Sequence, residues 1–171
     1  MGAVTDDEAA KAIDDFWQLV RGRARLSTLG GVLGETPAAT VPPPAWAFGD
    51  SPELADELLA LVLSGAKTAT ADLARSYEAA GEPIPRVGDL SIVLDGAGAP
   101  RALLRTTRVD IVPFAAVTAE HARLEGEGDR TLATWRADHE RYFRRTVPDG
   151  FVFSEESPVV CERFKVLYPK P

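Results

Sequence analysis

The sequence predicts an α+β fold in which helices flank a small, curled sheet or barrel. Two segments with the alternation of strands, Leu90–Leu94 and Ala102–Ile111, flank the turn-rich loop Asp95–Pro100 and predict a β-hairpin. A third segment of this kind, Pro158–Tyr168, predicts a closing strand. Segments with helical periodicity stand before and between these strands, and such interspersed elements around one sheet are typical of an α+β fold.

The N-terminal part is expected to be a helical extension of one main domain. Thr5–Glu8 has the spacing of a capping box, and apolar residues then recur at helical intervals. The stretch that follows is rich in Gly, Pro and Thr and contains Pro42–Pro44, which favours an extended connector. We therefore expect an N-terminal helix and connector over residues 1–40 and a domain over residues 41–171.

Three further helices are expected inside the main domain. The first begins at Ser51–Glu53, where the serine is a good N-cap and the proline fits the first turn, and it ends at Gly65. A short helix over Thr118–Glu125 and a longer one over Thr131–Arg144 follow. Between Gly65 and Pro85 the sequence predicts a turn and then polar, flexible chain.

Composition limits the classes of function. The chain has 171 residues with 45% hydrophobic and 26% charged residues, which suits one soluble domain with a real core. Its 19 basic and 26 acidic residues give a formal net charge of −7, which argues against a large footprint on duplex DNA. The single cysteine, Cys161, excludes an internal disulfide framework and a zinc finger. Without an apolar run of about 20 residues or a secretory signal, we expect no membrane association and a cytoplasmic location.

Two further clusters have competing interpretations. His121 and Glu125 lie four residues apart and share a helix face, so with Glu127 and Asp129 they could bind a metal; a local contact beside a solvated acidic loop is the favoured interpretation. A cluster of arginines on the last helix could form a local basic patch, although a solvated helix face is favoured: Arg136, Arg141, Arg144 and Arg145. The sequence has no Walker loop, dinucleotide fingerprint, HExxH or GxSxG motif.

Lys67 and Thr70 are candidates for a catalytic pair of a lysine and a hydroxyl group. They follow Gly65 in a segment of small residues that permits close approach of a substrate. A lysine whose ammonium is disfavoured by burial can take the proton of a neighbouring hydroxyl. A lysine near a helix C-terminus more often interacts with the helix dipole, and from the residues alone this second interpretation is preferred.

Five segments resemble the ASCH domain family, over residues 45–168. The family is marked by a G-x-K-x-x-T/S element, which here is Gly65, Lys67 and Thr70. The resembling segments are Trp46–Leu59, Ser64–Thr70, Pro85–Asp89, Ala122–Trp135 and Pro158–Phe164. The resemblance implies a PUA-like β-barrel, related to RNA-binding domains, with this element lining a cleft. Residues 1–40 are not covered by it.

The resemblance implies three alternative functions. The first is a hydrolase of N4-acetylcytidine and related N4-acylcytosine compounds, which we prefer because it gives a role to a lysine, a threonine and a glutamate together. The second is a ribonuclease acting on single-stranded RNA, and the third is a noncatalytic RNA-binding module. The expected partner is a modified nucleoside or single-stranded RNA. No organic cofactor is implied, and a divalent metal belongs only to the ribonuclease alternative.

Carried over to this chain, the catalytic residues are Lys67, Thr70 and Glu125, and Glu127 is a rival to Glu125. In one scheme Thr70 attacks the acyl carbonyl, neutral Lys67 takes its proton, and Glu125 protonates the departing amine. In the other, Lys67 stabilises the oxyanion and Glu125 activates water. Residues expected near the substrate are Phe48, which could stack on the base or belong to the core, and Ser51, Thr68, Arg75 and Glu127, with Trp46 and Asp50 as weaker candidates.

Overall fold

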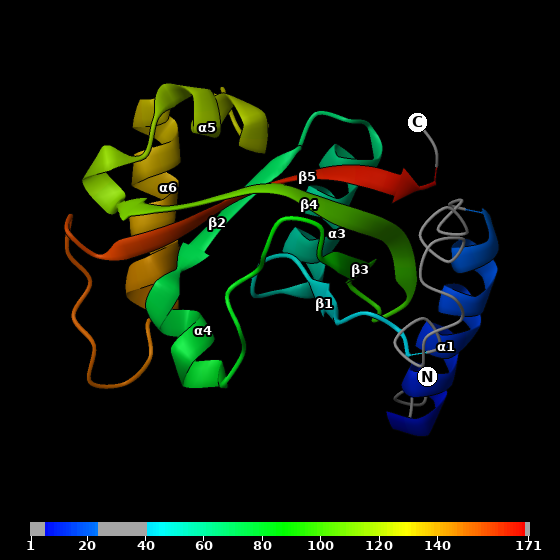
Figure 1. Cartoon of the computed structure of the whole chain (residues 1–171). Helices are drawn as coiled ribbons and strands as arrows, with labels where there is room; N and C mark the ends of the chain where they lie inside the picture. Colours follow the sequence, from blue (N-terminus) through cyan, green and yellow to red (C-terminus); the bar gives the residue numbers. More distant parts are fainter. Residues whose placement is uncertain (1–5, 24–40, 170–171) are drawn as a thin grey trace. The chain divides into compact units, whose positions relative to one another are not determined.

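The computed structural model describes residues 6–23 and 41–169, and they form an α+β fold (Figure 1). The sequence-based expectation of this fold class is confirmed. The chain divides into two compact units, and β4 (Pro100–Pro113) and β5 (Pro158–Tyr168) contribute residues to both. The first unit is built from Met1–Leu63, Leu90–Leu104 and Val166–Pro171, and the second from Ser64–Asp89 and Arg105–Lys165.

One five-stranded sheet has the order β1-β3-β4-β5-β2. Its edges are β1 (Ala45–Ala47), which pairs in parallel with β3 (Leu90–Leu94), and β2 (Ala69–Leu73), which pairs antiparallel with β5. The predicted hairpin and the closing strand are therefore confirmed. In the part of the chain that the structure describes, no helix is both long and apolar enough to cross a membrane.

In the first unit, α1 (Asp6–Arg23) packs on the sheet. Its Trp17 and Val20 are buried together with Ile92 of β3 and Leu103 of β4, so the predicted apolar stripe is a real packing face. The predicted cap at Thr5, and most of the predicted connector, lie outside the described residues. The proposed domain boundary between residues 40 and 41 stays a prediction.

The first unit also contains α3 (Pro52–Leu63), which begins where the sequence predicts. The backbone N–H of Leu54 donates to Ser51 Oγ at 3.2 Å, which confirms Ser51 as the N-cap. The helix ends just before Gly65, whose φ of +77° is the left-handed conformation that favours glycine. This turn leads the chain directly to Lys67 in the second unit.

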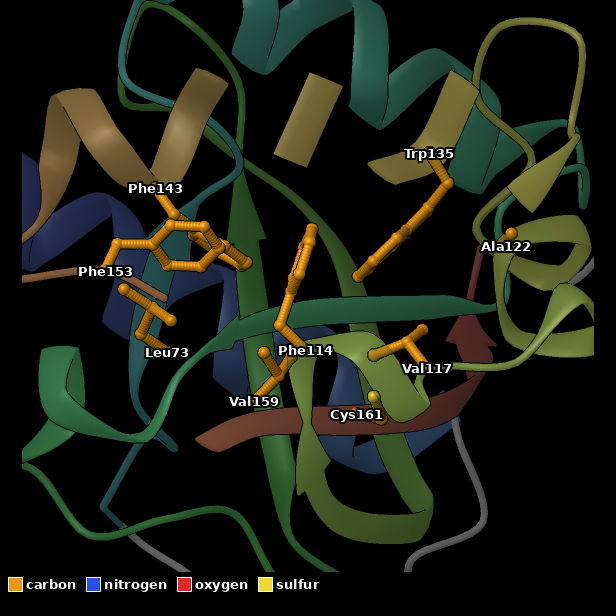
Figure 2. Packing of buried hydrophobic residues seen from close by; sticks show 9 residues of the cluster. All are labelled: Leu73, Phe114, Val117, Ala122, Trp135, Phe143, Phe153, Val159 and Cys161. Atoms are coloured by element: carbon orange, nitrogen blue, oxygen red, sulfur yellow. The ribbon is translucent and has the colours of Figure 1, made fainter. Parts of the chain in front are cut away.

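The second unit has an aromatic core between its strands and helices. Phe114 stacks on Trp135 with 5.5 Å between ring centroids and meets the edge of Phe153 at 5.0 Å. Figure 2 shows the Phe114 ring between Trp135 and the pair Phe143–Phe153. The helices that supply this core are η2 (Phe114–Ala116), α5 (Ala119–Glu125) and α6 (Leu132–Thr146), whereas α4 (Ala74–Ala80) contributes no residue to it. Both α5 and α6 begin where the sequence predicts, and the side chains of Thr118 and Thr131 are their N-caps.

The turn expected at Gly65 is confirmed, but the expectation of flexible chain from there to Pro85 was wrong. Strand β2 and helix α4 lie in this segment. β2 is an edge strand that is buried only at Ala69 and Leu73, so it lacks the alternation of apolar residues that signals a strand. α4 buries none of its residues, so it lacks the apolar stripe that signals a helix.

Cys161 gives a simple check of this core. Its thiol lies in the aromatic cluster of the second unit, and burial raises its pKa to about 12. The thiolate is the reactive species, so we expect Cys161 to react with a disulfide reagent only after unfolding. The rate of labelling at pH 8 with and without denaturant measures this. Rapid labelling of the folded protein would contradict the packing.

Candidate functional site: a buried lysine between two glutamates

Lys67 is held beside α5 by backbone hydrogen bonds of the residue that follows it. The Thr68 N–H donates to the Leu124 carbonyl oxygen at 2.8 Å, and the Thr68 carbonyl accepts from the Phe164 N–H at 3.0 Å. The Thr68 hydroxyl also donates to the Leu124 carbonyl oxygen, at 3.4 Å. Thr68, which we expected near the substrate, therefore joins the start of β2 to α5 and β5.

The ammonium of Lys67 contacts two carboxylates. Lys67 Nζ lies 3.1 Å from Glu125 Oε2 and 2.5 Å from Glu127 Oε1. The two acids differ in exposure: the side chains of Lys67 and Glu125 are each 1% exposed, whereas that of Glu127 is 30% exposed. Three residues that were selected from the sequence are thus in direct contact. The carboxylate of Glu125 is buried, and that of Glu127 is partly exposed to solvent.

Glu125 has further donors on both oxygens. Its Oε1 accepts from Trp135 Nε1 at 2.8 Å and lies 3.0 Å from His121 Nε2, and its Oε2 lies 3.5 Å from His139 Nε2. The predicted sharing of one helix face by His121 and Glu125 is confirmed as a contact. Trp135 and His139 were not among the expected site residues, because a helical period cannot show that their face meets a carboxylate of α5.

These contacts fix the charge states at the centre of the cluster. Burial alone would lower the pKa of Lys67, but the carboxylates of Glu125 and Glu127 raise it above its ordinary value. Burial would raise the pKa of Glu125, yet Lys67, His139 and the His121 hydrogen bond hold it well below its usual range. Lys67 is therefore an ammonium and Glu125 a carboxylate, which disagrees with the scheme in which a neutral Lys67 takes a proton from Thr70.

A glycine makes the approach of Lys67 to α5 sterically feasible. Gly126 ends α5 in the left-handed conformation, with φ of 72°. A Cβ atom built there would lie 2.2 Å from the carbonyl oxygen of Ala66 and 3.1 Å from the backbone nitrogen of Lys67. No side chain fits between these segments. The sequence signal for this requirement was the glycine-rich run at residues 125–129, but its pattern did not show which glycine is close to another backbone.

Thr70 lies in β2, where its Cα is opposite that of Glu162 in β5. Residues opposite each other in an antiparallel pair project from the same face of the sheet. The Glu162 carboxylate accepts a hydrogen bond from Thr106 Oγ1 of β4 at 2.6 Å, and both residues are buried. Burial raises the pKa of Glu162. The half-buried Thr70 thus adjoins a second polar group that the sequence analysis missed, because Glu162 is simply one position of a predicted strand.

The other candidate residues have varied surroundings. Phe48 and Ser51 belong to the first unit, where Phe48 is buried and its ring meets that of Trp46 with 4.6 Å between centroids. Arg75 lies in α4, is exposed, and its guanidinium contacts Glu78 at 2.7 Å. The expected roles of these three residues in substrate binding stay predictions.

The acidic loop and the arginine cluster have local partners. Asp129 Oδ1 accepts from the Thr131 N–H and hydroxyl at the start of α6. Among residues 6–23 and 41–169, no group of three or more His, Cys, Asp or Glu side chains is arranged to hold a metal ion. On α6, Arg141 pairs with Asp138 and Arg144 with Glu140, while Arg136 donates to the Ala115 carbonyl oxygen. These contacts favour the interpretation of a solvated helix face.

The buried ion pair predicts a dependence of stability on pH. The pKa of Glu125 is lowered on folding, so its contribution is present above the ordinary value of 4.5 and is lost as the pH falls through the folded-state pKa. We expect the difference in unfolding free energy between wild type and Glu125→Gln to shrink below about pH 4.5. Urea unfolding at several pH values measures it. Glu120→Gln, which removes an exposed carboxylate paired with Arg163, is the control and should leave the unfolding free energy almost unchanged at every pH.

Comparison with known proteins identifies the family to which this chain belongs. The model of the ASCH domain matches residues 44–168 of this chain. The chain belongs to the ASCH domain family. The match includes Lys67, Glu125 and Glu127, which we call the lysine–glutamate cluster. It begins close to the start predicted from the sequence and does not include α1.

Two solved structures are similar to this ASCH protein over most of their length. A protein from Enterococcus faecalis V583 is 34% identical with a TM-score of 0.73, and the match covers 91% of this chain and 88% of that one. An ASCH domain from Lactobacillus crispatus JV V101 is 30% identical with a TM-score of 0.74, and the match covers 91% and 96%. No curated protein matches the chain. The PUA-like fold expected from the sequence is thereby confirmed.

Proposed function

We propose that this ASCH protein is a hydrolase that cleaves the N4-acyl amide of N4-acetylcytidine or a related N4-acylcytosine nucleoside. The observation that supports the proposal is the buried ammonium of Lys67, which lies between the buried carboxylate of Glu125 and the partly exposed carboxylate of Glu127. Amide hydrolysis needs a fixed positive charge where the oxyanion develops and a base that can reach water. Lys67 and Glu127 provide this pair of groups.

The two glutamates have different roles in this proposal. Glu125 is fully buried and has donors on both oxygens, so it is a positioning residue that aims the Lys67 ammonium. Glu127 is 30% exposed and is the acid able to turn from Lys67 toward a substrate. We therefore assign the base to Glu127, the rival of Glu125 in the sequence analysis.

The chemical steps follow from these assignments. Glu127 takes a proton from water as the water oxygen attacks the acyl carbon, and the Lys67 ammonium stabilises the resulting oxyanion. When the C–N bond breaks, Glu127 returns the proton to the exocyclic nitrogen, which leaves cytidine and acetic acid, and the acid releases its proton to solvent as acetate. Thr70, half-buried at the start of β2, is placed by the proposal against the substrate as a hydrogen-bonding group rather than as the nucleophile.

Neutral nucleosides suit a protein with a formal net charge of −7 better than a polyanion does. Two of the arginines of α6 on which a ribonuclease would draw for RNA binding, Arg141 and Arg144, are paired with acids of their own helix. For these reasons we prefer a neutral nucleoside to single-stranded RNA as the substrate.

The test is incubation of the purified chain with N4-acetylcytidine and, in parallel, with single-stranded RNA, each with and without EDTA. We expect cytidine and acetate in equal amounts, in both the presence and absence of EDTA, and intact RNA. RNA cleavage without release of acetate would replace the proposal with a ribonuclease. RNA binding that weakens steeply with salt, without turnover of either substrate, would replace it with a binding module.

A further inference from the structure

His139 is a buried imidazole with a contact at each ring nitrogen. It lies on α6, its side chain is 11% exposed, and its ring stacks on that of Trp135 with 4.1 Å between centroids and an interplanar angle of 18°. Nδ1 is 3.0 Å from the Trp135 carbonyl oxygen, and Nε2 is 3.5 Å from Glu125 Oε2. None of the steps above uses this residue.

The partners of the ring decide where its protons are. A carbonyl oxygen only accepts, so Nδ1 must carry a proton to bond the Trp135 oxygen. A neutral ring with its proton on Nδ1 would direct the lone pair of Nε2 at the carboxylate of Glu125. The two acceptors are both satisfied only when both nitrogens carry protons.

We propose that His139 is a buried imidazolium and a positioning residue, which shares the charge of Glu125 so that Lys67 is free to stabilise an oxyanion. With His139 charged, the cluster holds two cations, His139 and Lys67, against two carboxylates, Glu125 and Glu127. Without it, the sealed carboxylate would be countered by Lys67 alone once Glu127 turns to the substrate. The imidazolium thus shares Glu125 Oε2 with the Lys67 ammonium and compensates the carboxylate when Glu127 turns away.

The charged neighbours of His139 agree with this state. Burial lowers its pKa, but Glu125 from α5 and Glu127 from the following loop raise it above the usual 6.5, against the opposing effect of Lys67. Asp72 of β2 also faces the imidazolium; burial raises the pKa of that carboxyl, and the charge of His139 opposes the rise. Because the folded-state pKa is raised, the proton is held below that value and is lost as the pH rises through it.

The experiment has one spectroscopic arm and one kinetic arm. Long-range ¹⁵N–¹H spectra of the wild-type histidine rings, assigned with His139→Gln, report the protonation of each ring nitrogen. We expect both nitrogens of His139 to carry protons at pH 6.5. A neutral ring at that pH would overturn the inference, and this arm needs no enzyme activity.

The kinetic arm rests on the proposed function. The Gln side chain can keep a hydrogen bond to Glu125 but has no charge, so His139→Gln separates a charge role from a packing role. We expect kcat for N4-acetylcytidine to fall about tenfold with KM little changed. A loss of this size is typical when a residue that orients a functional side chain is replaced. The loss of wild-type activity at high pH should be absent in the variant. An unchanged kcat and pH profile would overturn the inference, whereas an inactive wild type with a charged His139 would reject the proposed function only.

Discussion

Replacing Lys67 by methionine is expected to abolish turnover and to destabilise the fold together. The methionine keeps most of the apolar length but leaves Glu125 as a buried carboxylate that has lost its ammonium partner. Breaking a buried ion pair from one side costs about 3–5 kcal/mol of unfolding free energy. Urea unfolding at pH 7 measures the loss. Lys165→Met, which changes an exposed lysine of β5, should stay within about 0.5 kcal/mol of wild type.

A double variant separates charge from packing in the same site. Lys67→Met combined with Glu125→Gln removes both charges, and replacing a whole buried pair is often close to neutral for stability. We expect the double variant to recover at least half of the stability lost by Lys67→Met, while hydrolysis of N4-acetylcytidine stays absent. Additive losses of stability would show that the two side chains do not act as a pair.

Replacing Gly126 by alanine is the second change with a large expected effect. The new Cβ would meet the Ala66 carbonyl oxygen at 2.2 Å, and φ there is 72°, so backbone strain and a steric clash add. We expect a loss of about 4 kcal/mol or more of unfolding free energy, in the range that marks severe substitutions. Because the clash pushes α5 from Ala66, activity should fall too.

Gly81→Ala is the matched control for this prediction. Gly81 also ends a helix in the second unit, with φ of 68°, but a Cβ there meets no atom within 4 Å. It should therefore cost only the strain of a left-handed alanine, about 1–2 kcal/mol. If both alanine variants lose the same free energy, the close approach of Ala66 to Gly126 is not what requires glycine.

Patterns that repeat along the chain were predictive of the fold. The closing strand at Pro158–Tyr168 and the starts of α5 and α6 were predicted close to their observed positions, because alternation and helical periodicity are local properties. β2 and α4 were missed, because an edge strand and an exposed helix leave no apolar period. The pairing of β2 with β5 joins residues that lie far apart in the sequence, so no short window of sequence encodes it.

For the candidate site, residue identity was predictable and chemical state was not. Lys67, Glu125 and Glu127 were selected from the sequence, the last two from a resemblance to the family and from their place in the acidic run. That Lys67 is an ammonium follows only from its two partners, which lie 58 and 60 residues away in the sequence. The difference in exposure of the two glutamates, which separates their proposed roles, likewise arises only in the folded chain.

The assignment of Glu127 as the general base is tested most directly by comparing the rates of N4-acetylcytidine hydrolysis by wild type, Glu127→Gln and Glu120→Gln. Glu127 is partly exposed, so its variant should fold with near wild-type stability and isolate the proton-transfer role. We expect kcat to fall by about 10²–10⁴-fold for Glu127→Gln, the usual contribution of a general base, and to be unchanged for Glu120→Gln. A Glu127→Gln variant that turns over at the wild-type rate would contradict the assignment of Glu127 as the base, and with it the proposed use of the Lys67 cluster.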